Sequence, residues 1–183
     1  GALSVEIEPD ALDHLVDIRE DGSILLNMDY FDFATGLTMC RDEKWEKLFG
    51  IPRRQRESEI GQSYMNMALA IQQITEDVVS RMARTARKLT GSNYLVMAGG
   101  VALNCVANGA LLRQKIFDDL WIQPSAGDAG GALGAAFAAW HVGMEQPRKS
   151  VSEQDAMAGA FLGPEFGSDA IKRTAKTYQA SFG

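Results

Sequence analysis

Cysteine and histidine are scarce in this chain of 183 residues, which contains two of each. Cys40 and Cys105 lie far apart, so they have neither the spacing of a metal site nor the pattern of a disulfide framework. Two histidines, His14 and His141, are too few for a self-contained histidine-rich metal centre. We therefore expect both cysteines to be reduced thiols in a cytoplasmic protein.

Positive charge is also in deficit, because 18 lysines and arginines face 24 aspartates and glutamates, for a net charge of −6. This balance lacks the basic footprint of a nucleic-acid-binding protein, so we expect no nucleic-acid partner. No apolar run reaches membrane-spanning length, and we expect no membrane partner. An N-terminal segment with Glu6, Glu8 and Asp10 is too acidic for a signal peptide. An apolar content of 46% is typical of a soluble globular domain.

The hydrophobic pattern changes its period along the chain and predicts an alternation of strands and helices. Alternating apolar residues around the turn sequence Asp21-Gly22-Ser23 predict a β-hairpin within residues 15–30. Apolar residues at three- and four-residue steps predict a helix over 64–89. We then expect a buried strand over 94–98, a helix over 101–114, a strand over 120–123 and a helix over 132–142. This order predicts an α/β fold, a sheet with helical cover.

A glycine-rich turn, Ala98-Gly99-Gly100, follows the first of these apolar strands. Adjacent glycines at a strand end allow a sharp turn and let a ligand approach the backbone closely. Asn104, which we expect on the first turn of the next helix, has an amide able to donate to and accept from a ligand. A strand-to-helix turn that simply requires glycine, with Asn104 at the surface, accounts for the same residues. Both interpretations stay open on the spacing alone.

A second glycine-rich turn, Gly127-Asp128-Ala129-Gly130-Gly131, follows the next strand. Turns of this kind bring backbone N–H groups and a helix N-terminus to a ligand, where anions bind well. Asp128 is the only carboxylate between Leu120 and Val142, and it either caps the helix or binds a metal or ligand cation. No lysine follows as in a Walker A loop, and the spacing of a dinucleotide fingerprint is missing.

Two runs in the second half of the chain carry a family resemblance. MAGGVALNCVANG at 97–109 and WIQPSAGDAGGALGAA at 121–136 resemble the O-carbamoyltransferases of nodulation-factor and antibiotic biosynthesis. Shorter matches occur in family order at 21–23, 28–31, 49–54 and 162–166. The resemblance implies that residues 1–160 are the second lobe of an actin-like ATPase (ASKHA) domain. Residues 161–183 would then be a linker or the start of a synthase-like domain.

The resemblance also implies an activity. The synthase-like domain would make carbamoyl adenylate from carbamoyl phosphate and ATP, and the actin-like domain would pass the carbamoyl group to a hydroxyl of a sugar or natural product. A metal ion, iron in the related proteins, would be held by first-lobe histidines and by Asp128. Nucleotide contacts would fall on the two turns, at Gly99, Gly100, Asn104, Gly127 and Gly130. No catalytic residue or general base is assigned.

The resemblance places the first lobe before residue 1, so this chain holds half of the expected cleft. We expect it to be inactive alone and to self-associate through apolar surface that the first lobe would cover. Asn66 stands where the family leads us to expect an aspartate. Two alternatives remain, a tRNA threonylcarbamoyl transferase-like protein and a non-catalytic nucleotide-binding module.

Overall fold

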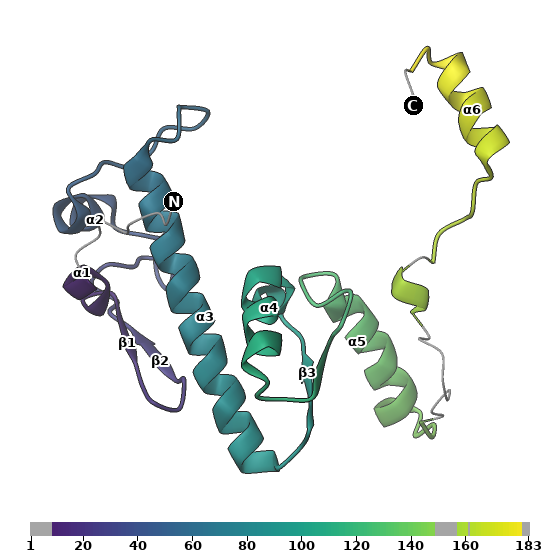
Figure 1. The fold of residues 1–183 in the computed structure, drawn as a ribbon, viewed down its shortest axis with the longest axis horizontal. Coiled ribbons are helices and arrows are strands. Elements are labelled where there is room, and N and C mark those ends of the chain that lie inside the picture. The colour runs from purple at the N-terminus through teal and green to yellow at the C-terminus, as the bar shows by residue number, and fades with distance from the viewer. Residues whose placement is uncertain (1–8, 149–156, 161, 181–183) are drawn as a thin grey trace. The chain divides into compact units, whose positions relative to one another are not determined.

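The computed structural model describes residues 9–148, 157–160 and 162–180, and Figure 1 shows their helices and strands. The acidic segment with Glu6 and Glu8 lies outside the described residues. The chain divides into two compact units, of which one ends at Asp128 and the other begins at Ala129. Within the described ranges, no helix is both long enough and apolar enough to cross a membrane.

The first unit runs from a short helix and a hairpin to a long helix and a parallel strand–helix–strand unit. Its elements are α1 (Pro9–Asp13), β1 (Val16–Ile18), β2 (Ile24–Leu26), α2 (Asp42–Phe49), α3 (Gln62–Thr90), β3 (Tyr94–Met97), a 3₁₀ helix (Gly100–Leu103), α4 (Cys105–Gln114) and β4 (Asp119–Ile122). β1 and β2 pair antiparallel, whereas β3 and β4 pair parallel. The expected hairpin, long helix and α/β class are confirmed.

The turn of the β1–β2 hairpin is shaped by its own sequence and packs on α3. Asp21 Oδ1 accepts hydrogen bonds from the backbone N–H and the hydroxyl of Ser23, at 2.9 and 2.6 Å. Gly22 adopts φ +85°, and a Cβ built on it would lie 2.5 Å from the backbone nitrogen of Met82. Glycine is therefore required here twice, for the left-handed conformation and for the close approach to α3.

Helix α3 contacts both the hairpin and α4 (Figure 1). It ends at Gly91, which adopts φ +66° and donates its N–H to the carbonyl of Arg87, as a helix-terminating glycine does. Ala83 on α3 forms a buried apolar cluster with Leu111 on α4 and with Phe117. This cluster is the core that holds the parallel strands against the long helix.

The two-stranded parallel sheet packs against this core through one face. Leu95, Met97 and Leu120 lie against the buried cluster. Tyr94 and Val96 point to the opposite face and are 67% and 68% exposed. The expectation of a buried strand over 94–98 is therefore wrong for its outer face. A fully apolar strand is typical of a sheet with helices on both faces, and in the described residues of this unit only one face carries them.

The helix expected over 101–114 is two helices separated at Asn104. The 3₁₀ helix ends at Leu103, and Asn104 takes an extended conformation with φ −72° and ψ 94° before α4 begins at Cys105. Asn104 is thus the N-cap residue of α4, which corrects its expected place on the first helical turn. The extended backbone lets its side chain turn back and accept from the N–H of Ala107.

The second unit, taken by itself, is helical in its described residues. Its elements are α5 (Gly130–Ala138), a π-helical turn (Ala139–Gly143), a short 3₁₀ turn (Ala158–Ala160) and α6 (Ser168–Thr177). The helix expected over 132–142 is present and begins two residues earlier. The domain boundary near residue 160 stays a prediction.

Candidate functional site

The first glycine turn and the beginning of the second meet at one edge of the β3–β4 sheet. Because the two strands are parallel, the turns that follow them lie at the same carboxyl edge. The backbone N–H of Gly99 donates to the carbonyl oxygen of Ala126 at 2.9 Å. A Cβ built on Gly127 would lie 3.6 Å from Cδ1 of Leu103, so the start of the second turn passes close to the end of the 3₁₀ helix that follows the first turn. This edge is where open α/β sheets bind ligands.

The two glycines of the first turn are required for different reasons. Gly99 adopts φ +99° and ψ 158°, a conformation that is essentially restricted to glycine. Gly100 lies outside the left-handed range, and a Cβ built on it meets no atom within 4 Å. The fold therefore requires glycine at 99 but not at 100. Open space beside the backbone of Gly100 is what the close approach of a ligand needs.

Asn104 connects the first turn to α3 through a reciprocal amide pair. Its Oδ1 accepts from the backbone N–H of Ala107 at 3.1 Å and from Gln72 Nε2 at 3.2 Å. Its Nδ2 donates to Gln72 Oε1 at 2.8 Å. Gln72 Nε2 also donates to Glu76 Oε1 at 2.9 Å, one helical turn further along α3. One N–H of the Asn104 amide remains for a ligand, so its contact with a nucleotide stays a prediction beside its structural role.

Sequence reasoning missed Gln72. Glutamine is common on helices, and 32 residues separate it from its partner Asn104, so no local pattern marks it. The pairing depends on how α3 packs beside the turn that follows β3, which is a tertiary feature.

Asn108 is a second residue of the matched run whose role only the structure shows. It is buried, and its Nδ2 donates to the carbonyl oxygen of Ala102 at 2.8 Å, which fastens α4 to the 3₁₀ helix. Its Oδ1 is the one buried side-chain nitrogen or oxygen in the described part of the chain that has no hydrogen-bond partner. Leaving such an acceptor unpaired costs about 1–3 kcal/mol.

Position 66 is also buried. Asn66 is 6% exposed, and its Oδ1 accepts from Gln62 Nε2 at 2.8 Å. A neutral amide is accommodated there more readily than a carboxylate, because burying a charge without a partner is far more costly.

Asp128 comes directly after Ala126 and Gly127, and it is exposed to solvent. Ala129, and not Asp128, is the N-cap residue of α5, and no side chain caps that helix, which argues against the capping interpretation. The described residues contain no group of three or more histidine, cysteine, aspartate or glutamate side chains able to hold a metal ion. Asp128 therefore fits a metal as one ligand of an incomplete site, and its role stays a prediction.

The family model described as "Carbamoyltransferase N-terminus" matches residues 4–137, which include both glycine turns. This chain belongs to the carbamoyltransferase family. The resemblance carried by the two motifs is thus confirmed at the level of the family.

Similar proteins from bacteria agree with this assignment. The chain is 52% identical over 161 residues to a Synechocystis protein described as uncharacterized, sll1178, covering 88% of this chain and 26% of that protein. It is 37% identical over 123 residues to Nodulation protein NolNO of Sinorhizobium fredii, covering 67% of this chain and 17% of that protein. A 48-residue stretch is 46% identical to Nodulation protein U of Bradyrhizobium diazoefficiens, covering 26% of this chain and 8% of that protein. The chain therefore spans about a quarter or less of the length of these relatives.

Proposed function

We propose that this chain is part of an O-carbamoyltransferase that transfers a carbamoyl group from carbamoyl adenylate to a hydroxyl of a sugar or natural product. The observation that carries the proposal is the family match over 4–137, together with the first glycine turn and the start of the second, which meet at one sheet edge. On this proposal the chain forms the second lobe of an actin-like domain, and carbamoyl adenylate is made from carbamoyl phosphate and ATP elsewhere in the protein. The chain alone is then inactive, because it holds one side of the cleft.

In the proposed transfer, the hydroxyl oxygen of the acceptor attacks the carbamoyl carbon. The bond between that carbon and the phosphate oxygen of the adenylate breaks, AMP leaves with the bonding electrons, and the hydroxyl proton passes to solvent. The backbone N–H of Gly100 and those at the start of α4 favour the negative charge of the leaving phosphate. The open space beside Gly100 allows the phosphate to approach these groups closely.

Asp128 is the residue of this chain that we propose as a metal ligand. It is exposed, and its carboxylate makes no hydrogen bond or ion pair with other described residues, so the carboxylate is free to bind a cation. A bound metal ion, which we expect to be iron, would supply Lewis-acid chemistry at the site. The remaining ligands would come from parts of the protein outside the described residues.

The substitution Gly100→Val in the full-length protein tests the nucleotide contact. The three added side-chain carbons would occupy the space that the phosphate needs, so we expect the affinity for a non-reactive analogue of carbamoyl adenylate to fall at least about tenfold. The unfolding temperature should stay close to that of the wild type, because a Cβ at this position meets no atom within 4 Å. Gly61→Val is a matched control, since Gly61 also has open space around it and lies outside both turns.

Titration calorimetry with the adenylate analogue measures the affinity, and thermal unfolding measures the fold. Unchanged affinity for the analogue in Gly100→Val would contradict a nucleotide site at this turn, and loss of folding would assign the turn a purely structural role. Release of AMP from ATP that requires both carbamoyl phosphate and a sugar acceptor would support the transfer itself.

A further inference from the structure

A pocket that involves none of the glycine-turn residues lies where the loop before α2, the helix α2 and the start of α3 come together. It has a volume of 430 Å³, within the range of about 300–1,000 Å³ that small-molecule sites occupy. Its lining includes the half-buried rings of Trp45, Phe49 and Tyr64 and the side chain of Met67. The proposed transfer needs a place for its acceptor, and no residue has been assigned to that task.

The aromatic walls present their apolar rings to the pocket because their polar atoms are already bonded to backbone. Trp45 Nε1 donates to the carbonyl oxygen of Tyr30 at 2.9 Å. The hydroxyl of Tyr64 donates to the carbonyl oxygen of Pro52 at 2.9 Å. These hydrogen bonds also fix the orientation of both rings, so the pocket offers flat apolar surfaces that are formed in advance.

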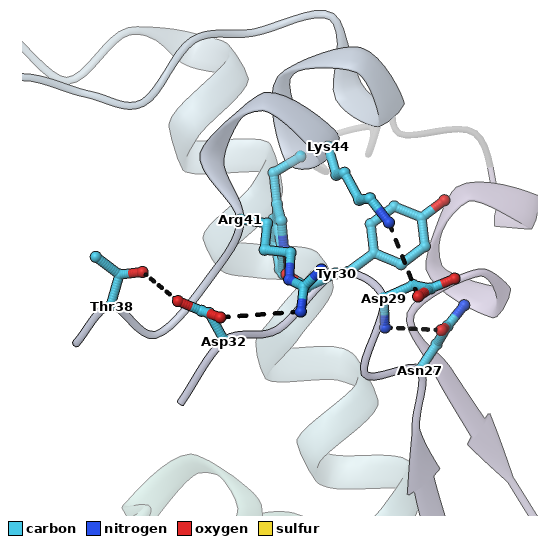
Figure 2. Close-up of polar contacts among 8 residues, drawn as sticks. Asn27, Asp29, Tyr30, Asp32, Thr38, Arg41 and Lys44 are labelled. Carbon is cyan, nitrogen blue, oxygen red and sulfur yellow. Dashed lines mark hydrogen bonds and ion pairs between the residues drawn. The ribbon is translucent and has the colours of Figure 1, made fainter. Parts of the chain in front are cut away.

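Polar contacts within the loop that forms one wall, and one contact to Lys44 of α2, hold this loop in place (Figure 2). Asp32 accepts a hydrogen bond from the hydroxyl of Thr38 at 3.3 Å and forms an ion pair with Arg41 at 3.9 Å. Lys44 of α2 forms an ion pair with Asp29 at 3.8 Å. Each exposed ion pair contributes little alone, so we expect these contacts to stabilise the loop only modestly.

The charged side chains of the pocket balance one another. Asp42 Oδ2 and Arg53 form an ion pair with an N–O distance of 3.0 Å, and Arg54 donates to the carbonyl oxygen of Ser58. Glu46 also lines the pocket, and its carboxylate has no hydrogen bond or ion pair with any described residue. Two carboxylates and two guanidinium groups attract no ion strongly, but they supply many donors and acceptors to an uncharged ligand.

We propose that this pocket is the recognition site for the acceptor, and that it binds a neutral polyhydroxylated ring of the size of a single sugar. The apolar face of the ring lies on Trp45 and Phe49, and its hydroxyls bond to Glu46 and to the Asp42–Arg53 pair. This assignment rests on the proposed carbamoyltransferase function. Aromatic walls beside the unbonded carboxylate of Glu46 suit a ring that has apolar C–H faces and hydroxyls around its edge.

The position of the pocket along α3 fits this role. Tyr64 lines the pocket, and Gln72, eight residues later, bonds to Asn104 beside the first glycine turn. Eight residues of α-helix correspond to about 12 Å along the axis. Along the axis of α3, this separation is one that an acceptor of several linked rings could span.

The test uses the full-length protein, methyl α-D-glucopyranoside as the probe and the variant Glu46→Gln. Saturation-transfer NMR should show the glucoside bound to the wild type, and Glu46→Gln should weaken the binding about tenfold, as expected for loss of a charged hydrogen-bond acceptor. Glu43→Gln, on the same helix but outside the pocket, is the matched control and should bind like the wild type. In transfer assays, Glu46→Gln should raise the KM for a sugar acceptor and leave the KM for carbamoyl phosphate unchanged.

The outcomes separate this proposal from the proposed function. Transfer to sugars with the same acceptor KM and glucoside affinity in Glu46→Gln and Glu43→Gln would overturn the pocket assignment and leave the function standing. Binding of the glucoside that depends on Glu46, in a protein that transfers no carbamoyl group, would support the sugar site and overturn the function. Failure of the wild type to bind the glucoside at millimolar concentration would overturn the pocket assignment.

Discussion

The amide pair of Asn104 and Gln72 yields a quantitative prediction about stability. Replacing Asn104 by alanine removes the N-cap of α4, worth about 1 kcal/mol, because Oδ1 no longer accepts from Ala107. It also removes the two hydrogen bonds with Gln72, each worth about 0.5–1.5 kcal/mol in a part-buried setting. We expect the free energy of unfolding to fall by about 2–4 kcal/mol. Gln72→Ala leaves the cap intact and should cost about 1–3 kcal/mol.

Urea unfolding of the wild type, both single variants and the double variant measures these losses. Since the two side chains bond to each other, the double variant should be more stable than additivity predicts, with a coupling energy of about 1 kcal/mol. Asn104→Asp provides a graded control, because its carboxylate can still cap α4 but cannot donate to Gln72. A coupling energy near zero would refute the pairing. A loss in Asn104→Ala no larger than in Gln72→Ala would refute the cap.

Three further predictions concern the hairpin turn and the metal. Gly22→Ala should lower the free energy of unfolding by about 2 kcal/mol or more, because φ is +85° and Met82 leaves no room for a Cβ. The control Gly61→Ala should lower it by less than about 1 kcal/mol. Equal losses in urea unfolding would contradict this prediction. Hydrogen bonds from Ser23 lower the pKa of Asp21. The wild type should therefore be more stable than Asp21→Asn above the ordinary aspartate pKa, and this advantage should disappear as pH falls through the lowered pKa. A stability difference that does not change with pH would count against this prediction. In the full-length protein, Asp128→Ala should lower the bound iron measured by elemental analysis while Asp118→Ala does not, and equal metal content in both would exclude Asp128 as a ligand.

Much of the local structure follows from the sequence by short-range rules. Backbone sterics predict the turn at Asp21-Gly22-Ser23 and the glycine turns that follow the two parallel strands. The hydrophobic period predicts the long amphipathic helix that ends at Gly91. These patterns depend on residues within a few positions of each other, so they can be recognised without knowledge of the fold. The two motif runs likewise identified the family, because a motif is recognised from the order and spacing of its residues, which the sequence alone provides.

The tertiary structure decided what lies beside what. The pairing of Gln72 with Asn104, and the aromatic pocket at the start of α3, depend on packing between segments that are distant in sequence. The tertiary structure also decided the burial of β3. Its apolar sequence is typical of a buried strand, but Tyr94 and Val96 on its outer face are exposed. Periodicity reports how apolar a strand is, but burial depends on which other elements pack against each face. Sequence therefore determined the elements and the family, and tertiary packing determined which side chains meet to form a site.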